Sequence, residues 1–504
     1  MSMRELPRTL GALRASGYRS RSVKEELREN AVAALRAGRP LFQGLIGYER
    51  TVVPQVVNAL LAKHDLLLLG LRGQAKTRLA RKLVELLDER VPVLAGSELN
   101  EDPLRPLTRW AQELLAEAGD DAPIAWLERE ERYREKLATP DVSMADLIGD
   151  LDPIRAANLR AEYSSERALH YGIVPRTNRG IFCLNELPDL AARIQVGLLG
   201  ILQEREVQIR GFPVRLPLDV AMVFTANPED YTQRGAIITP LKDRIASQIL
   251  THYPATLEHA RAITAQEAWD RRGGGPEVHL PAFLRDAVEE VGFAARESDL
   301  LDASSGVSAR LTISLLECVV SNAERRALLH GAASTVVRPL DFDPALAAVT
   351  GKIELVYQGE QEGVSNVARQ LLGEGFARTA ARCLPAVQGE DAEDEAAVFG
   401  PWKPIVDWFG RGGTLELSDR ESDAQALERL SAIDGLEAFV RKHVALAEPE
   451  RELLPAMELA VEALHQAKLL AKEELDRGVR YADMLGGMLG ELGGGGKKPP
   501  KKKR

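Results

Sequence analysis

The feature that most constrains this fold is a loop of small residues between an apolar run and a helical pattern. Four leucines, Leu66–Leu69, lead directly into Gly70-Leu71-Arg72-Gly73-Gln74-Ala75-Lys76-Thr77. After Thr77, apolar residues recur at the three- to four-residue spacing of an amphipathic helix. A strand, a glycine-containing loop and a helix in this order favour an α/β fold with a phosphate-binding loop.

Such a loop binds a polyphosphate because small residues let backbone N–H groups crowd around it at the start of a helix. The lysine reaches the β- and γ-phosphates, and the hydroxyl after it ligates Mg²⁺. We therefore expect ATP and Mg²⁺ at this loop. The candidate binding residues are Gly70, Gly73, Gln74, Ala75, Lys76 and Thr77, with Thr77 also a metal ligand.

The loop departs from the full pattern at Ala75, where glycine normally precedes the lysine. Alanine is small and the best helix former, so it fits the first helical turn if its φ is negative. We expect a variant loop with that geometry. The alternative is an ordinary strand, turn and helix in which the Lys-Thr pair is accidental.

A second apolar run, Gly180–Leu184, ends in the polar pair Asn185-Glu186. Glu186 is the candidate base that orients and activates an attacking water. An Asp normally holds the Mg²⁺ shell at the position of Asn185. Asparagine keeps the oxygen and loses the charge, so metal affinity is in question. The alternative is a core strand with a polar end.

Two further candidates follow. The apolar run Val220–Ala226 ends in Asn227, an amide placed to orient the water or the γ-phosphate, although Asn-Pro alone is only a turn signal. Arg244 is a candidate for stabilising transition-state charge at a neighbouring subunit's nucleotide. A lone arginine is more often a surface residue.

Composition bounds the class of protein. A chain of 504 residues exceeds one core, and about two to four domains are expected. The net charge of −10 argues against a surface that coats nucleic acid. Three scattered cysteines indicate neither a zinc site nor a disulfide framework. No apolar stretch approaches the roughly 20 residues of a membrane span, and we expect a cytoplasmic protein.

The pattern along the chain predicts an α/β domain followed by helices. Short apolar runs suited to buried parallel strands are Leu66–Leu69, Val91–Leu94, Gly180–Leu184 and Val220–Thr225. No persistent strand pattern follows Pro254. The predicted parts are an N-terminal helical arm (1–43), the α/β nucleotide-binding domain with insertions (44–254), an all-α lid (255–345), a helical connector (346–387), an acidic linker (388–398), a C-terminal helical domain (399–484) and a disordered basic tail (485–504).

Together these elements resemble the AAA+ ATPases, most closely the magnesium chelatase ATPase subunit and its MoxR relatives. The resemblance covers roughly residues 45–327. Residues 146–152 look like the segment ahead of the family's helix-2 insert, and residues 207–216 look like the hairpin before sensor 1. Residues 179–187 look like its Walker B strand. Asn227 matches sensor 1, Arg244 the arginine finger and Arg310 the sensor 2 arginine of the helical lid.

The resemblance implies an ATP-driven homo-oligomeric ring, commonly hexameric, with nucleotide at subunit interfaces. It also implies a remodelled protein partner, often reached through a protein with a von Willebrand A domain. Two alternatives remain. One is a nucleotide-gated scaffold with little turnover, motivated by Ala75 and Asn185. The other is a DNA-associated motor or transcription activator, for which the basic tail is the only added support.

Overall fold

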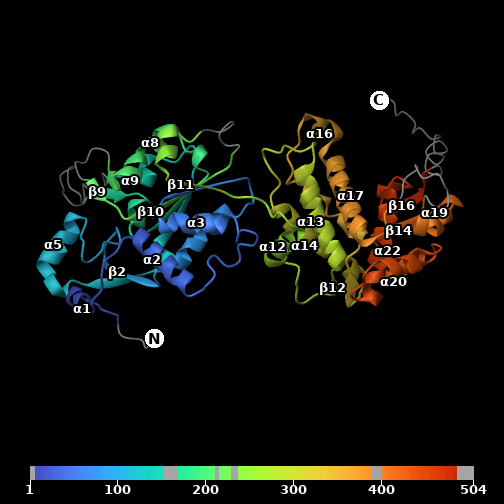
Figure 1. The fold of residues 1–504 in the computed structure, drawn as a ribbon, viewed down its shortest axis with the longest axis horizontal. Helices are drawn as coiled ribbons and strands as arrows, with labels where there is room; N and C mark the ends of the chain where they lie inside the picture. The colour runs from blue at the N-terminus through green and yellow to red at the C-terminus, as the bar shows by residue number, and fades with distance from the viewer. Residues whose placement is uncertain (1–5, 153–167, 210–214, 229–235, 388–398, 485–504) are drawn as a thin grey trace, which may run out of the picture. The chain divides into compact units, whose positions relative to one another are not determined.

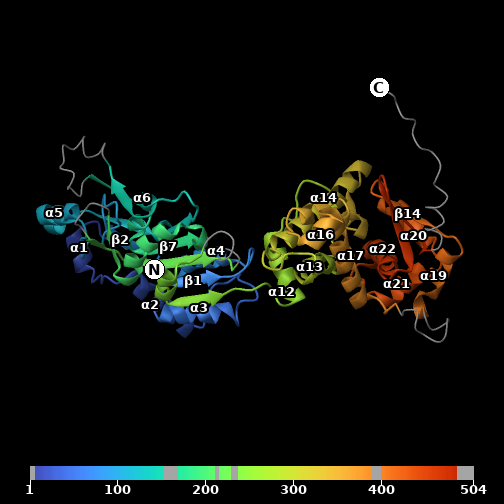
Figure 2. The same ribbon diagram turned by 90° about the horizontal axis from the view of Figure 1, so that it is seen from above.

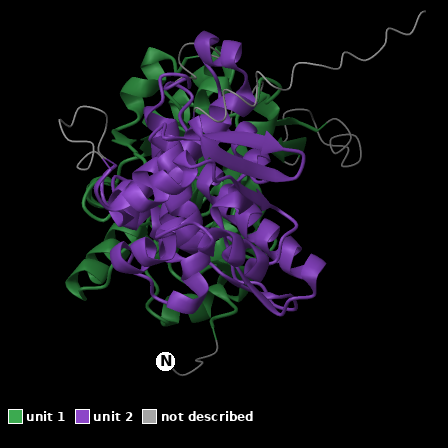
Figure 3. Cartoon of the chain, turned by 90° about the vertical axis from the view of Figure 1, so that its right-hand side faces the viewer, with its two compact units in different colours: residues 1–253 green, residues 254–504 purple. Residues whose placement is uncertain are grey.

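The computed structural model describes residues 6–152, 168–209, 215–228, 236–387 and 399–484. The chain forms two compact units, residues 1–253 and 254–504 (Figure 3). The predicted acidic linker and basic tail lie outside the described residues. Among the helices of the described ranges, none has both the length and the apolar character that crossing a membrane requires.

A parallel five-stranded sheet forms the centre of the first unit (Figure 1). Its order is β11-β1-β10-β7-β4, and every neighbouring pair is parallel. The strands are β11 (Ser247–Leu250), β1 (Leu66–Leu69), β10 (Val220–Ala226), β7 (Gly180–Asn185) and β4 (Tyr133–Leu137). The predicted fold class, a parallel sheet flanked by helices and followed by a mainly helical region, is confirmed.

Helices cover both faces of this sheet, which is why its central strands are continuously apolar. Leu66 and Leu68 of β1 pack in one core with α2 (Val23–Arg36), α3 (Val52–Leu61) and α4 (Lys76–Lys82). Leu67 and Leu69 pack in a second core on the opposite face. The helices there are α8 (Ala192–Gly197), α9 (Leu199–Gln203) and α11 (Thr239–Arg244). Figure 1 shows α8 and α9 across the sheet from α2 and α3.

The part predicted as an N-terminal arm contributes directly to this core. Val23, Leu27 and Ala31 of α2 are buried against the sheet. Glu26 of the same helix accepts from both terminal nitrogens of Arg132, at 2.7 and 2.6 Å, and both side chains are buried. A buried carboxylate needs such a partner, so this ion pair fixes α2 beside β4.

One predicted strand is misplaced. Val91–Leu94 lies in β2 (Arg90–Leu94), which pairs antiparallel with β3 (Ile124–Glu128) outside the main sheet. The fifth strand of the parallel sheet is instead β4, whose sequence Tyr-Arg-Glu-Lys-Leu has no apolar run. β4 is an edge strand that keeps charged side chains in water, so hydrophobicity alone does not reveal it.

Shorter elements fill the insertions of the first unit. The predicted hairpin before the strand of Asn227 is present as the antiparallel pair β8 (Glu206–Gln208) and β9 (Arg215–Pro217), although residues 210–214 lie outside the description. Near the predicted insert, β5 (Gly149–Leu151) pairs with β6 (Leu169–Tyr171). The remaining helices here are α1 (Leu10–Ala15), α5 (Arg109–Ala118) and α6 (Met144–Leu147).

The second unit is mainly helical, as predicted, and its described residues share one apolar core from Phe283 to Tyr481. Residues before and after the acidic segment therefore pack together. The long helix α22 contacts α17, α20, α21 and β15 (Figure 2). The helices are α12 (Leu257–Glu267), α13 (Ala282–Glu297), α14 (Arg310–His330), α15 (Leu346–Thr350), α16 (Tyr357–Glu362), α17 (Val364–Cys383), α19 (Lys403–Gly410), α20 (Asp423–Ser431), α21 (Leu436–His443) and α22 (Pro449–Gln466).

Strands also occur where the sequence predicted only helices. An antiparallel sheet of order β14-β16-β15 is formed by Leu415–Ser418, Gly478–Asp483 and Leu470–Leu475. In the predicted all-α lid, β12 (Glu277–His279) pairs parallel with β13 (Ser334–Val336). These strands have three to six residues, and all except β13 carry charged side chains, so they lack the long apolar alternation by which strands are recognised.

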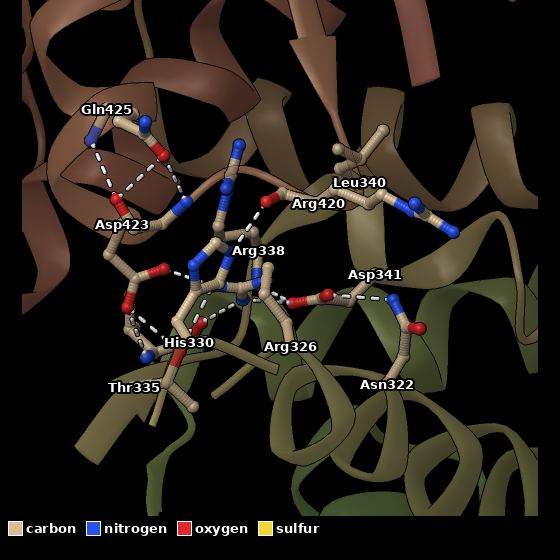
Figure 4. A network of polar contacts seen from close by, with 12 residues as sticks. Asn322, Arg326, His330, Thr335, Arg338, Leu340, Asp341, Arg420, Asp423 and Gln425 are labelled. Carbon is tan, nitrogen blue, oxygen red and sulfur yellow. Dashed lines mark hydrogen bonds and ion pairs between the residues drawn. The ribbon is translucent and has the colours of Figure 1, made fainter. Parts of the chain in front are cut away.

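A buried polar network joins elements from both sides of the acidic segment (Figure 4). Arg326 of α14 is 3% exposed and donates to Asp341 at 2.9 Å and to the carbonyl of Val336 at 2.8 Å. It also pairs with Asp423, the first residue of α20. Burial works to lower the pKa of Arg326, but the charges of Asp341 and Asp423 outweigh it and raise that pKa. The guanidinium therefore stays charged inside the unit.

We predict that Arg326→Met destabilises the protein by about 3–5 kcal/mol, because it leaves Asp341 buried without its counter-charge. The neighbouring Arg325 provides the control. Its side chain is 53% exposed and pairs with Asp419 at 3.1 Å, so Arg325→Met is expected to cost less than about 1 kcal/mol. Urea unfolding of both variants measures the difference. Equal losses would contradict a structural role for the network.

Candidate nucleotide-binding site

The loop between β1 and α4 has the shape that its glycines predict. A Cβ on Gly70 would lie 2.0 Å from Thr251 Oγ1 and 2.2 Å from Gln74 Oε1, so no side chain fits there. Gly73 has φ of +73°, a conformation that glycine adopts without strain. The two glycines therefore serve different needs, one of space and one of backbone geometry.

Ala75 does not have the negative φ that we predicted. Its φ and ψ are 53° and 20°, in the left-handed region, and it is the residue before the first turn of α4. The loop thus keeps the turn for which the full pattern supplies glycine. An L-residue other than glycine pays roughly 1–2 kcal/mol for this conformation.

Lys76 is buried at 7% exposure, and its ammonium lies against the loop itself. Nζ donates to the carbonyl oxygens of Gly70 and Leu71, the second at 3.0 Å. It also donates to Asn227 Oδ1 at 2.6 Å. Lys76 and Asn227, which are far apart in sequence, are therefore in direct contact.

Asn227 extends this contact to Glu186. Its Nδ2 donates to Glu186 Oε2 at 2.8 Å, so one amide bridges the loop lysine and the candidate base. Glu186 follows β7 with φ of 55°, and its backbone N–H donates to Thr225 Oγ1 at 3.1 Å. β1, β10 and β7 are adjacent and parallel, so their carboxyl ends bring these three side chains to one edge of the sheet.

The expected metal ligands also meet. Thr77 Oγ1 donates to Asn185 Oδ1 at 3.4 Å, and Thr225 Oγ1 donates to the same oxygen at 3.1 Å. Burial raises the pKa of the Cys183 thiol to about 12, and this neutral thiol also lies against Asn185 Oδ1, at 3.6 Å. The amide oxygen is thus surrounded by neutral donors.

Thr225 is the site residue that sequence reasoning missed. It contacts both Asn185 and Glu186, and its side chain is 1% exposed. The available signal was a hydroxyl in the otherwise apolar strand Val220–Ala226, since a buried polar group requires a partner. We infer that Thr225 orients the Asn185-Glu186 pair.

Three predicted residues are placed differently. The Gln74 side chain is buried and accepts from Thr251 Oγ1 at 2.8 Å, so its amide is directed into the protein. Arg244 donates to Gln203 Oε1 and to the carbonyl of Pro240, both at 2.8 Å. Arg310 begins α14 in the second unit and is exposed. The roles of all three remain predictions.

The residues present fit a triphosphate better than they fit a tightly held metal ion. The loop offers Gly70, Gly73 and a buried lysine charge at a strand-to-helix junction. For Mg²⁺, Thr77 and Asn185 supply neutral oxygens. Among the described residues, no group of three or more His, Cys, Asp or Glu side chains could hold a metal ion.

Comparison with known proteins identifies a family model for part of the chain. Residues 160–248, from before β6 into β11, match the Sigma-54 interaction domain. No curated protein matches the sequence. The matched segment contains Asn185, Glu186, Thr225, Asn227 and Arg244.

Two solved structures resemble this chain at low sequence identity. A crystal structure of NtrX from Brucella abortus is 13% identical, over 52% of this chain and 48% of that chain, with a TM-score of 0.30. The chain thus aligns with about half of the length of that protein. A structure of the complex between subunits BchI and BchD of magnesium chelatase is 19% identical, over 64% of this chain and 99% of that chain, with a TM-score of 0.32.

We predict that Ala75→Gly stabilises the protein by about 0.5–1 kcal/mol. Relief of roughly 1–2 kcal/mol of left-handed strain exceeds the roughly 0.5–1 kcal/mol of added backbone entropy lost on folding. Ala75→Val, which places a β-branched residue at the same positive φ, is expected to destabilise. Urea unfolding of the three proteins checks the order; a less stable Ala75→Gly would contradict the assigned conformation.

We also predict that Asn185→Asp lowers the Mg²⁺ concentration that half-saturates ATP binding. One added charge about 4 Å from a doubly charged ion is worth about 2 kcal/mol even in a watery site, or about 30-fold in affinity. A fluorescent ATP analogue titrated with Mg²⁺ measures the effect. Asn58→Asp, at an exposed position on α3, controls for net charge and should leave the midpoint unchanged. No difference between the variants would exclude Asn185 from the metal environment.

Proposed function

We propose that this protein is an ATPase that binds ATP at Gly70–Thr77 and hydrolyses it with Glu186. The observation that carries the proposal is the bridge formed by Asn227, which contacts Lys76 at 2.6 Å and Glu186 at 2.8 Å. A phosphate-binding lysine and a carboxylate base must lie on either side of the γ-phosphate, and this amide connects the two.

The residues have distinct roles in the proposed reaction. Glu186 orients a water for in-line attack on the γ-phosphate and accepts its proton, while Asn227 holds Glu186 in place. Lys76 neutralises negative charge that develops on the phosphate oxygens. Mg²⁺, held with Thr77 and Asn185, supplies further charge neutralisation when bound. Arg244 from a second copy and Arg310 are proposed to act on the γ-phosphate in the assembled form.

The wider setting follows from the resemblance to the magnesium chelatase and MoxR group of AAA+ ATPases. We propose a cytoplasmic homo-oligomeric ring, hexameric as is common in that group, that uses ATP to remodel a protein partner or assist metal insertion. The partner proposed is one that carries a von Willebrand A domain. Within the single chain, Arg244 lies at the end of α11 and donates to Gln203 and to the carbonyl of Pro240. In the proposed ring it would exchange these contacts for the neighbouring subunit's nucleotide.

The match of residues 160–248 favours a second candidate, an activator of transcription that acts on a sigma-54 factor. The match includes the hairpin β8–β9, on which Gln208, Arg215 and Pro217 are exposed and could contact a partner. Pull-down of a purified sigma-54 factor by the ATP-loaded protein distinguishes this candidate. Binding that requires ATP would favour the activator over the metal-insertion role.

We predict that Glu186→Gln reduces steady-state ATP turnover by about 100-fold or more, because a general base contributes on the order of 10²–10⁴ in rate. ATP binding should persist, since Lys76 and the loop are unchanged. Glu204→Gln at an exposed position at the end of α9 is the matched control and should keep full turnover. Equal rates for wild type and Glu186→Gln would reject the ATPase and leave a nucleotide-gated scaffold.

A further inference from the structure

The segment Thr251–Tyr253 follows β11 and ends the first unit, and Pro254 begins the second. None of its residues belongs to the catalytic set described above. All three nevertheless contact the phosphate-binding loop or the residues that support it. We call Thr251–Tyr253 the exit segment.

Thr251 holds the beginning of the loop. Its backbone N–H donates to the carbonyl of Leu69 at 2.8 Å, and its hydroxyl donates to Gln74 Oε1 at 2.8 Å. Thr251 and Gln74 are both buried. This contact accounts for the inward direction of the Gln74 amide, and it fills the space that excludes a side chain at Gly70.

Two tyrosine hydroxyls hold the outer carbonyl groups of the loop. Tyr253 donates to the carbonyl of Arg72 at 2.8 Å. The Tyr48 hydroxyl lies 2.7 Å from the carbonyl of Gln74 and 3.0 Å from that of His252. The His252 ring in turn stacks edge-on against Tyr48 and lies 2.7 Å from Thr51 Oγ1.

These contacts determine which way the loop amides face. In a planar trans peptide, the C=O and the following N–H point in opposite directions. A carbonyl of Arg72 held by Tyr253 therefore directs the N–H of Gly73 away from Tyr253. A carbonyl of Gln74 held by Tyr48 likewise directs the N–H of Ala75 away from Tyr48. Backbone N–H groups are the part of such a loop that binds phosphate.

We propose that the exit segment positions the phosphate-binding loop, with Tyr253 as the positioning residue. Nucleotide binding to the loop then also stabilises the backbone at the junction with the second unit. This inference rests on the proposed function. The strained φ of Ala75 persists because the surrounding contacts hold the loop in place. Tyr253 is covalently joined to Pro254, so any shift of the Arg72 peptide reaches the junction through one hydrogen bond.

The test compares Tyr253→Phe with the wild type in the full-length chain. The substitution removes one hydroxyl and keeps the ring. We expect the Kd for a fluorescent ATP analogue to rise about 3–10-fold, which corresponds to loss of one hydrogen bond. Hydrogen exchange provides a second measurement. In the wild type, saturating ATP should slow exchange both in residues 70–77 and in residues 251–256.

In Tyr253→Phe, saturating ATP should still protect residues 70–77 but protect residues 251–256 much less. Two variants serve as controls. Tyr357→Phe, at a residue that is 73% exposed in the second unit, should change neither measurement. Tyr48→Phe should weaken ATP binding. Because it keeps the Tyr253 hydroxyl, it should still show ATP-dependent protection of residues 251–256.

Two failures are distinguishable. A wild type that binds no ATP overturns the proposed function and the role of the exit segment with it. A wild type that binds ATP, together with a Tyr253→Phe variant of unchanged Kd and unchanged protection of residues 251–256, overturns the positioning role alone.

Discussion

The candidate site depends on the two hydrogen bonds that the Asn227 side chain makes with Lys76 and Glu186. The two polar atoms of this side chain connect Lys76, the first residue of α4, with Glu186, after β7, across the end of β10. An amide suits this position because it donates with one atom and accepts with the other. The arrangement requires three adjacent parallel strands, and the two apolar cores that cover the sheet keep those strands in register.

The site combines the loop geometry that suits glycine with two unusual residue choices. Ala75 adopts the left-handed turn that suits glycine, and Asn185 presents a neutral oxygen where a carboxylate is usual. Both choices act on binding more directly than on the base, because Glu186 retains its contacts with Asn227 and Thr225. For the proposed ATPase, these choices favour nucleotide binding that depends weakly on Mg²⁺ and turnover that is limited by metal affinity.

The sequence predicts the first unit well where an apolar run in the sequence forms a central strand of the sheet. The leucines of β1, the loop and the apolar strands β7 and β10 follow from hydrophobic runs and one motif. The charged edge strand β4, the antiparallel pairing of β2 and the sheet β14-β16-β15 do not, because their placement depends on tertiary partners. Thr225 and Tyr253 are missed for the same reason: each is defined by contacts more than 30 residues away. The prediction of a negative φ for Ala75 was wrong, because the contacts that hold the loop outweigh the helix propensity of alanine at this position.

The most direct test of the account is ATP binding by Lys76→Met compared with Lys82→Met, which removes a lysine from the same helix where it pairs with Glu85 on the surface. Isothermal titration of ATP with Mg²⁺ into both variants and the wild type gives the comparison. The account predicts that Lys76→Met loses detectable binding and that Lys82→Met binds as the wild type does. Wild-type affinity in Lys76→Met would show that Gly70–Thr77 is not a phosphate-binding loop.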